Sequence, residues 1–124
     1  MGLLQGCSPG FWAQHPQQWN LTPYSPDDIF NTVFGVVVFS ADATLLQVIN
    51  LDAEGPSPQV RQLSRQAVAA LLNASDPRVN YPLTEAEVIA QYQNAINSGD
   101  LAVIVALSEL FDSFNNLGCP IPAN

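Results

Sequence analysis

One stretch of the sequence, residues 58–75, most constrains what the chain can fold into. Apolar side chains recur along it at helical spacing and so share one face: Val60, Leu63, Ala67, Val68 and Leu71. Ser57 is suited to cap the first free backbone amides, and Pro58 suits the first helical position. Small alanine side chains beside the apolar face allow another helix to approach closely. We therefore predict a long helix against which the remaining helices pack.

Further helices are predicted on both sides of this stretch, because capping residues and prolines divide the sequence into short helical segments. Ser25 followed by Pro26 marks one start, and Thr84 with Glu87 forms the capping-box pattern of another. The predicted segments are residues 11–15, 17–19, 26–34, 85–97 and 101–116, together with a helix that is capped by Ser40 or Asp42 and runs through residues 45–49. Residues 36–39 read locally as a strand, but the sequence offers no partner strand, so we expect an extended, buried connector.

These segments predict an all-α fold. We expect one domain over residues 1–124, built as a compact bundle of five to six helices with one disulfide between its N- and C-terminal ends. Residues 101–116 are apolar on most sides at their start, so this helix is placed in the middle of the bundle. It is expected to pack together with the helices of residues 58–74 and 85–97.

The two cysteines, Cys7 and Cys119, lie near opposite ends of the chain. Domain ends are often close in space, so one bridge between them is the expected arrangement. A bridge that closes so long a loop stabilises a fold by about 4–5 kcal/mol in the chain-entropy model. It also indicates an oxidising compartment. The alternative is a pair of free buried thiols in a cytosolic protein.

The charge balance is strongly acidic. Eleven Asp and Glu residues stand against three arginines and one histidine, with no lysine, for a formal net charge of −8. Nucleic acids and anionic lipids are bound largely through Lys and Arg, so we expect no nucleic-acid partner. No apolar run approaches the roughly 20 residues of a membrane span, so we expect no membrane insertion. Scarce charged residues, with Asn, Gln, Ser and Thr in their place, are typical of a secreted, extracellular protein.

The single histidine, His15, is the obvious candidate for a general base. One alternative function is therefore a small enzyme or metal-dependent protein that uses His15 with a nearby Asp or Cys. Cys7 is close in sequence but is expected in the bridge, and the G-x-S-x-G pattern of a nucleophilic serine does not occur. One histidine and two remote cysteines also fall short of a zinc ligand set. We predict no catalytic residue, no metal and no cofactor.

The acidic residues 50–55 begin like a calcium-binding loop, with oxygen ligands at alternate positions and Gly55 at the sixth. The twelfth position is Arg61, where such a loop requires a bidentate Glu. We therefore expect a solvated acidic loop rather than an EF-hand, with a weaker surface calcium site as the alternative.

Two of the three arginines, Arg61 and Arg65, lie one turn apart on the predicted helix of residues 58–75. In an excess of carboxylates each should find a partner. We predict a partly buried structural ion pair between these arginines and Glu109 or Asp112 of the last helix. A pair of arginines that binds an anion is the functional alternative.

The N-terminal segment is rich in large aromatic residues. Trp12, His15, Trp19 and Tyr24 are the candidate binding residues. Exposed rings would favour stacking against sugars and hence a carbohydrate-binding module that uses Trp12, Trp19 and Tyr24. Buried rings would instead anchor the N-terminus onto the core.

The block Cys7-Ser8-Pro9-Gly10-Phe11-Trp12, followed by a His and a second Trp, resembles the opening of a secreted domain that recurs in extracellular proteins of bacteria and other microbes. Those domains continue with a segment like residues 65–73 and close near a Gly-Cys-Pro like residues 118–120. Where relatives carry Lys after the first Trp, this chain has Ala13. The resemblance covers nearly the whole chain. It implies an extracellular compartment and this architecture, and no particular activity.

Together these patterns favour a non-enzymatic extracellular or cell-surface module for binding or assembly. The expectation depends on the missing catalytic pattern, the acidic surface without lysine, the bridge between the chain ends and the aromatic block. Its expected partners are further copies of the protein or an extracellular carbohydrate.

Overall fold

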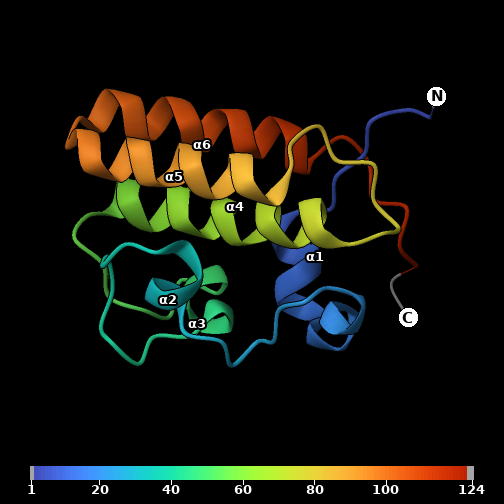
Figure 1. Cartoon of the computed structure of the whole chain (residues 1–124), viewed down its shortest axis with the longest axis horizontal. Helices are drawn as coiled ribbons and strands as arrows, with labels where there is room; N and C mark the ends of the chain where they lie inside the picture. Colours follow the sequence, from blue (N-terminus) through green and yellow to red (C-terminus); the bar gives the residue numbers. More distant parts are fainter. Residues whose placement is uncertain (1, 123–124) are drawn as a thin grey trace.

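Helices make up the regular structure of residues 2–122, the part of the chain that the computed structural model describes (Figure 1). In chain order they are α1 (Pro9–Gln14), the 3-10 helix η1 (Pro16–Leu21), α2 (Phe30–Phe34), α3 (Leu45–Ile49), α4 (Pro58–Ser75), α5 (Glu85–Ser98) and α6 (Leu101–Asn115). No β-strand occurs among these residues. The all-α prediction is confirmed, and residues 2–122 hold seven helices rather than five or six because the N-terminal segment forms both α1 and η1. The predicted domain 1–124 also includes residues 1, 123 and 124, which lie outside the described residues.

Helix α4 runs through the middle of the molecule, with α5 and α6 on one side and α1, α2 and α3 on the other (Figure 1). Ten of its 18 residues are buried. Small side chains such as Ala67, Ala69 and Ala70 are fully covered, which shows that neighbours approach α4 on several sides. The predicted central helix is therefore confirmed.

The prediction that the last helix lies in the middle of the bundle was wrong. Helix α6 is outermost (Figure 1) and buries Ile104, Phe111 and Asn115 along one side. A helix that is apolar on most sides can be buried on all sides, or it can lie on the outside with some apolar side chains exposed. Helix α6 is of the second kind.

Local capping explains how α5 and α6 form a hairpin on α4. The Thr84 hydroxyl accepts a hydrogen bond from the Glu87 amide (3.1 Å), and the Glu87 carboxylate accepts one from the Thr84 amide (2.9 Å), which confirms the predicted capping box. Gly99 ends α5 in the left-handed conformation with φ of 63°. The Asp100 carboxylate then accepts from the Ala102 amide (2.9 Å) and starts α6.

Helix α2 begins at Phe30 and not, as predicted, at Pro26. The reason is a non-local backbone contact. Ile29 and Thr44 form an isolated antiparallel bridge, and the Phe30 amide donates to the Ala43 carbonyl (2.9 Å). This pairing holds Ile29 in an extended conformation, after a turn over residues 25–28, and ties α2 to the start of α3. Helix α3 is capped by Thr44, so the predicted cap at Ser40 or Asp42 was wrong.

Residues 36–39 form the predicted connector without strand pairing, but it bends at Val36 and Phe39 and only part of it is buried. Phe39 is 6 % exposed and packs in the core, whereas Val37 is 85 % exposed. The Asn31 side chain fixes the connector by accepting from the amides of Val38 (3.0 Å) and Phe39 (3.2 Å) and donating to the Phe39 carbonyl (2.8 Å). A single asparagine thus takes the place of the missing partner strand.

The N-terminal segment and the segment after α6 lie side by side (Figure 1). Gly6 and Gly118 exchange two backbone hydrogen bonds of 3.1 Å and 3.2 Å. Gly6 also passes so close to the end of α6 that a Cβ at this position would lie 2.1 Å from the Phe114 carbonyl oxygen. Only glycine fits there without a backbone shift.

We expect Gly6→Ala to lower the free energy of unfolding by about 1–3 kcal/mol, because the added methyl group forces the two backbones apart. Urea unfolding followed by tryptophan fluorescence measures the loss. Gly10→Ala is the matched control, since a Cβ there meets its nearest atom, Ser8 Oγ, at 3.8 Å in the interior of α1. Equal unfolding midpoints for the two variants would contradict the close approach at Gly6.

Candidate functional site

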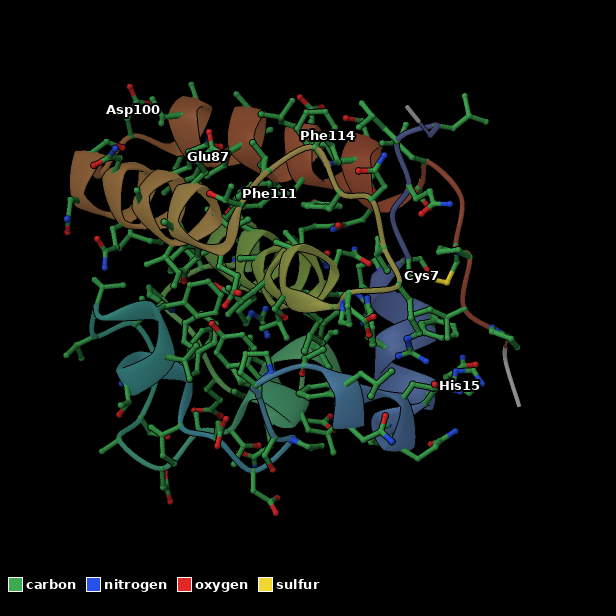
Figure 2. The ribbon with its side chains drawn as sticks, turned by 45° about the vertical axis from the view of Figure 1, so that its right-hand side comes forward. Cys7, His15, Glu87, Asp100, Phe111 and Phe114 are labelled. Atoms are coloured by element: carbon green, nitrogen blue, oxygen red, sulfur yellow. A yellow bond between two sulfur atoms is a disulfide. The ribbon has the colours of Figure 1, made fainter. Side chains whose placement is uncertain are left out.

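Cys7 and Cys119 form the predicted disulfide, with an S–S distance of 2.08 Å and a Cα–Cα distance of 4.3 Å. Figure 2 shows the sulfur atoms beside Cys7 next to α1. Neither cysteine is free, so the alternative of two buried thiols is wrong. The version of the enzyme alternative that pairs a Cys7 thiol with His15 is excluded for the same reason.

A fully buried asparagine, Asn73 near the end of α4, organises the surroundings of the bridge. Its Oδ1 accepts from the Cys7 amide (2.8 Å) and from Trp12 Nε1 (3.1 Å). Its Nδ2 donates to the Cys7 carbonyl (2.8 Å) and to Asn115 Oδ1 (3.0 Å). Both lone pairs and both hydrogens of the amide are therefore used. The Asn73 side chain thus accepts from the Cys7 amide and donates to the Cys7 carbonyl, as the backbone of a paired strand would.

The hydrogen-bond network continues from Asn115 on α6. Asn115 Oδ1 also accepts from the Tyr81 hydroxyl (2.8 Å), and its Nδ2 donates to the backbone carbonyl (3.1 Å) and Oε1 (2.9 Å) of Gln66. Sequence reasoning missed both asparagines. The available signal was a single amide in an otherwise apolar stretch of α4, since a polar group buried there needs partners.

The two tryptophans are core residues. Trp12 is 0 % exposed and Trp19 is 1 % exposed. Trp19 Nε1 donates to the Trp12 carbonyl (2.9 Å), and Trp12 Nε1 donates to Asn73. Each indole thus has its apolar body in the core and its N–H satisfied. Buried rings cannot stack against a sugar, so the carbohydrate alternative loses two of its three residues.

Tyr24 is half-buried at an open depression of about 410 Å³ that is also lined by Trp19, Asn20 and Asp28. Its hydroxyl donates to Glu85 Oε1 at 2.6 Å and so ties the N-terminal part of the chain to α5. Burial raises the pKa of Tyr24, and the hydrogen bond to Glu85 raises it further. Tyr24 is therefore a neutral phenol at physiological pH, and its hydroxyl proton is used in the hydrogen bond to Glu85.

His15 lies at the end of α1 (Figure 2). Its Nδ1 is 2.8 Å from the Phe11 carbonyl oxygen, and its ring stacks on the Phe11 ring with centroids 4.8 Å apart. A carbonyl oxygen only accepts, so Nδ1 is the donor in this hydrogen bond. These contacts give His15 a structural role in closing α1.

The predicted ion pair between α4 and α6 is not formed among the described residues. Arg65 donates to the Ile49 carbonyl instead. Asp112 accepts from Gln66 Nε2 (3.0 Å) and from the Asn116 side chain (3.0 Å). The predicted pair of Arg61 or Arg65 with Glu109 or Asp112 was therefore wrong: Arg65 binds a backbone carbonyl, and Asp112 binds side-chain amides.

The ion pair that the described residues contain joins Arg78 to Asp76, which is 2 % exposed. Arg78 Nη2 lies 2.7 Å from Asp76 Oδ2, and Nε donates to Oδ1 (3.0 Å). The guanidinium also donates to the side chain (2.9 Å) and the backbone carbonyl (3.0 Å) of Gln18. The bonds to Asp76 raise the pKa of Arg78. This pair ties the loop after α4 to η1, and its sequence signal was the Asp-Pro-Arg that directly follows the long helix.

The acidic loop of residues 50–55 is exposed at Asp52 and Glu54. Both line an open depression of about 330 Å³ together with Asp42. Between residues 2 and 122, no group of three or more His, Cys, Asp or Glu side chains is placed to hold a metal ion. A solvated acidic loop therefore stays the interpretation of this segment.

The outward face of α6 is the largest feature that sequence reasoning did not interpret correctly. Four side chains, which we call the outer stripe, are exposed at a spacing of three, four and three residues: Val103, Ala106, Leu110 and Ser113. They lie on the side of α6 turned away from Ile104 and Phe111, which pack against the rest of the fold. Leu101, Val105 and Leu117 are further exposed apolar residues on or just after this helix. The signal was present as the apolar excess of residues 101–107.

No helix within the described residues is long and apolar enough to cross a membrane. Contiguous apolar surface on a folded domain is typical of a contact site for another molecule.

Comparisons of the chain with protein-family models, with curated proteins and with solved structures find no match. The resemblance to secreted microbial domains therefore stays an expectation.

Proposed function

We propose that this chain is an extracellular, non-enzymatic interaction module whose binding surface is the outward face of α6. The observation that carries the proposal is the exposure of that face, where Val103 and Leu110 are 42 % and 41 % exposed. Both project from a helix whose other side is firmly packed. Exposure of apolar surface to water is unfavourable, and a partner that covers the surface removes this cost. We therefore place the binding surface at the outer stripe.

The disulfide and the composition support the extracellular part of the proposal. A bridge between the two ends of a chain forms and persists in oxidising compartments. The surface is rich in Asn, Gln, Ser and Thr and carries no lysine. In such a module the bridge, Asn73 and the buried tryptophans hold a rigid scaffold, and α6 presents the contact surface on a secondary-structure element rather than on a loop.

Panning a phage-displayed peptide library against the immobilised, oxidised domain tests the proposal. We expect selected peptides to be amphipathic and to lose binding to Leu110→Glu, because a carboxylate in the outer stripe opposes burial of the apolar face. Val105→Glu is the matched control. It places the same charge on the same helix at a residue that is 39 % exposed, against 41 % for Leu110.

The control position lies about 120° around α6 from the outer stripe, at 100° per residue. Peptides that bind the parent and both variants equally, or that are lost with Val105→Glu alone, would contradict a binding surface centred on the outer stripe. Selected peptides that bind the depression beside Tyr24 would instead place the binding surface there, where the carbohydrate alternative expects it.

A further inference from the structure

We propose that the partner covering the outer stripe is a second copy of this chain, with the two α6 helices packed antiparallel about a two-fold axis. This inference rests on the proposed function and names its partner. It follows from the spacing of the stripe, the sizes of its side chains and the charge of the protein.

The spacing of the outer stripe is that of a helix–helix contact. Val103, Ala106, Leu110 and Ser113 follow one another by three, four and three residues, which is the a/d spacing of helices that pack along their length. All four are exposed, so this pattern does not serve the packing of the domain itself. Ile104, Phe111 and Asn115 serve that purpose on another side of the helix.

The sizes of the four side chains alternate, and this favours antiparallel pairing with an identical helix. Large residues stand at positions 103 and 110, and small ones at 106 and 113. Antiparallel pairing places Leu110 of one copy opposite Ala106 of the other, and Val103 opposite Ser113, so each large side chain meets a small one. Parallel pairing would place Leu110 against Leu110 and leave a gap between the two Ala106 residues. A two-fold axis therefore makes the stripe complementary to itself.

Charge also favours a second copy over a partner of opposite charge. The chain carries a net charge of −8, yet the outer stripe contains no charged side chain. Glu109 and Asp112 lie on the same helix, about 80° and 140° around it from the centre of the stripe at 100° per residue. A basic partner would gain most by docking over carboxylates, whereas two acidic copies meet best where each presents none.

The size of the outward face of α6 sets the expected strength of dimerisation. A helix of 15 residues is about 22 Å long. One face of it offers less than the roughly 800 Å² that each partner contributes to a stable interface, so we expect a dissociation constant of about 0.1–1 mM. Such weak pairing suits assembly at a surface where copies are held close together.

Sedimentation equilibrium of the full, oxidised chain tests the proposal. Across a concentration range of about 0.02–1 mM, which brackets the expected constant, we expect a monomer–dimer equilibrium for the parent and for Val105→Glu and a monomer for Leu110→Glu. Raising the salt concentration from about 0.01 M to 0.15 M shortens the Debye length from about 30 Å to 8 Å and should strengthen dimerisation, because the copies carry like charges. A monomeric parent throughout, or equal dimerisation of both variants, would overturn the proposal.

Two further variants, Ala106→Cys and Leu110→Cys, test the antiparallel register. Residues 106 and 110 lie opposite each other across the proposed axis, so a mixture should form the mixed disulfide under mild oxidation faster than either variant crosslinks alone. Faster crosslinking of Leu110→Cys alone would overturn the antiparallel register. If the parent is monomeric but selected peptides still distinguish Leu110→Glu from Val105→Glu, the self-pairing fails while the proposed binding surface stands.

Discussion

Removing the disulfide is expected to lower the free energy of unfolding by about 5 kcal/mol. The bridge joins residues separated by 112 positions, and closing a loop of that length in the unfolded chain costs about 16 cal/mol/K of entropy in the chain-entropy model. A domain of this size has a total stability of about 5–15 kcal/mol, so the variant Cys7→Ala with Cys119→Ala should be marginally folded at best. Urea unfolding of the variant and of the parent measures the difference.

Reduction of the parent provides the control for this prediction. Dithiothreitol should lower the unfolding midpoint of the parent to near that of the double variant and leave the double variant unchanged. A loss below about 1 kcal/mol, well under the chain-entropy value, would contradict the prediction that the bridge stabilises the fold by restricting the unfolded chain.

The second large effect is expected at Asn73. Asn73→Leu keeps a side chain of similar size but leaves three buried groups without a partner, the Cys7 amide, the Cys7 carbonyl and Trp12 Nε1. It also removes one of the two hydrogen bonds that Asn115 Oδ1 accepts. An unsatisfied buried polar group costs about 1–3 kcal/mol, so we expect a loss of about 4 kcal/mol or more. Chemical unfolding followed by tryptophan fluorescence measures it and also reports the changed environment of Trp12.

Asn94→Leu is the control for Asn73→Leu, because Asn94 is an exposed residue of α5. Its effect should stay within about 0.5 kcal/mol, as for most surface substitutions. A similar small effect for Asn73→Leu would mean that Asn73 does not hold the N-terminal segment on α4.

The features predicted correctly from the sequence are those that depend on short stretches of chain. The capping box of Thr84 and Glu87 lies within four consecutive residues, and the amphipathic pattern of α4 lies within one helix. The bridge between Cys7 and Cys119 was predictable because the chain holds only two cysteines and the ends of a domain tend to meet. Local signals of this kind do not depend on how distant elements are arranged.

The features predicted wrongly depend on distant elements. The start of α2 is displaced by a backbone bridge to Thr44, which no local propensity encodes. Arg65 has the Ile49 carbonyl within reach, and Asp112 has Gln66, so the expected ion pair between them does not form. Sequence reasoning identified the right kind of interaction, an arginine–carboxylate pair that joins two parts of the fold, but not the residues that make it, Arg78 and Asp76.

The position of α6 shows a different limit. A helix that is apolar on most sides satisfies the same pattern whether it lies in the core or presents a face to a partner. The pattern predicted burial, and the structure instead leaves Val103 and Leu110 exposed. Likewise, the aromatic block suggested a binding site, whereas Trp12 and Trp19 are buried. The interaction surface that we propose therefore lies on the helix first assigned to the core.

Dilution of the oxidised, ¹⁵N-labelled protein, followed by amide chemical shifts, tests most directly the claim that α6 presents the contact surface. Between about 1 mM and 0.05 mM, the range in which a weak interface dissociates, we expect shift changes at the outer stripe and its immediate neighbours on α6, and none around Tyr24 or His15. Changes centred on Tyr24 and Asn20 would contradict a contact surface on α6, and spectra that do not depend on concentration would contradict its pairing with a second copy.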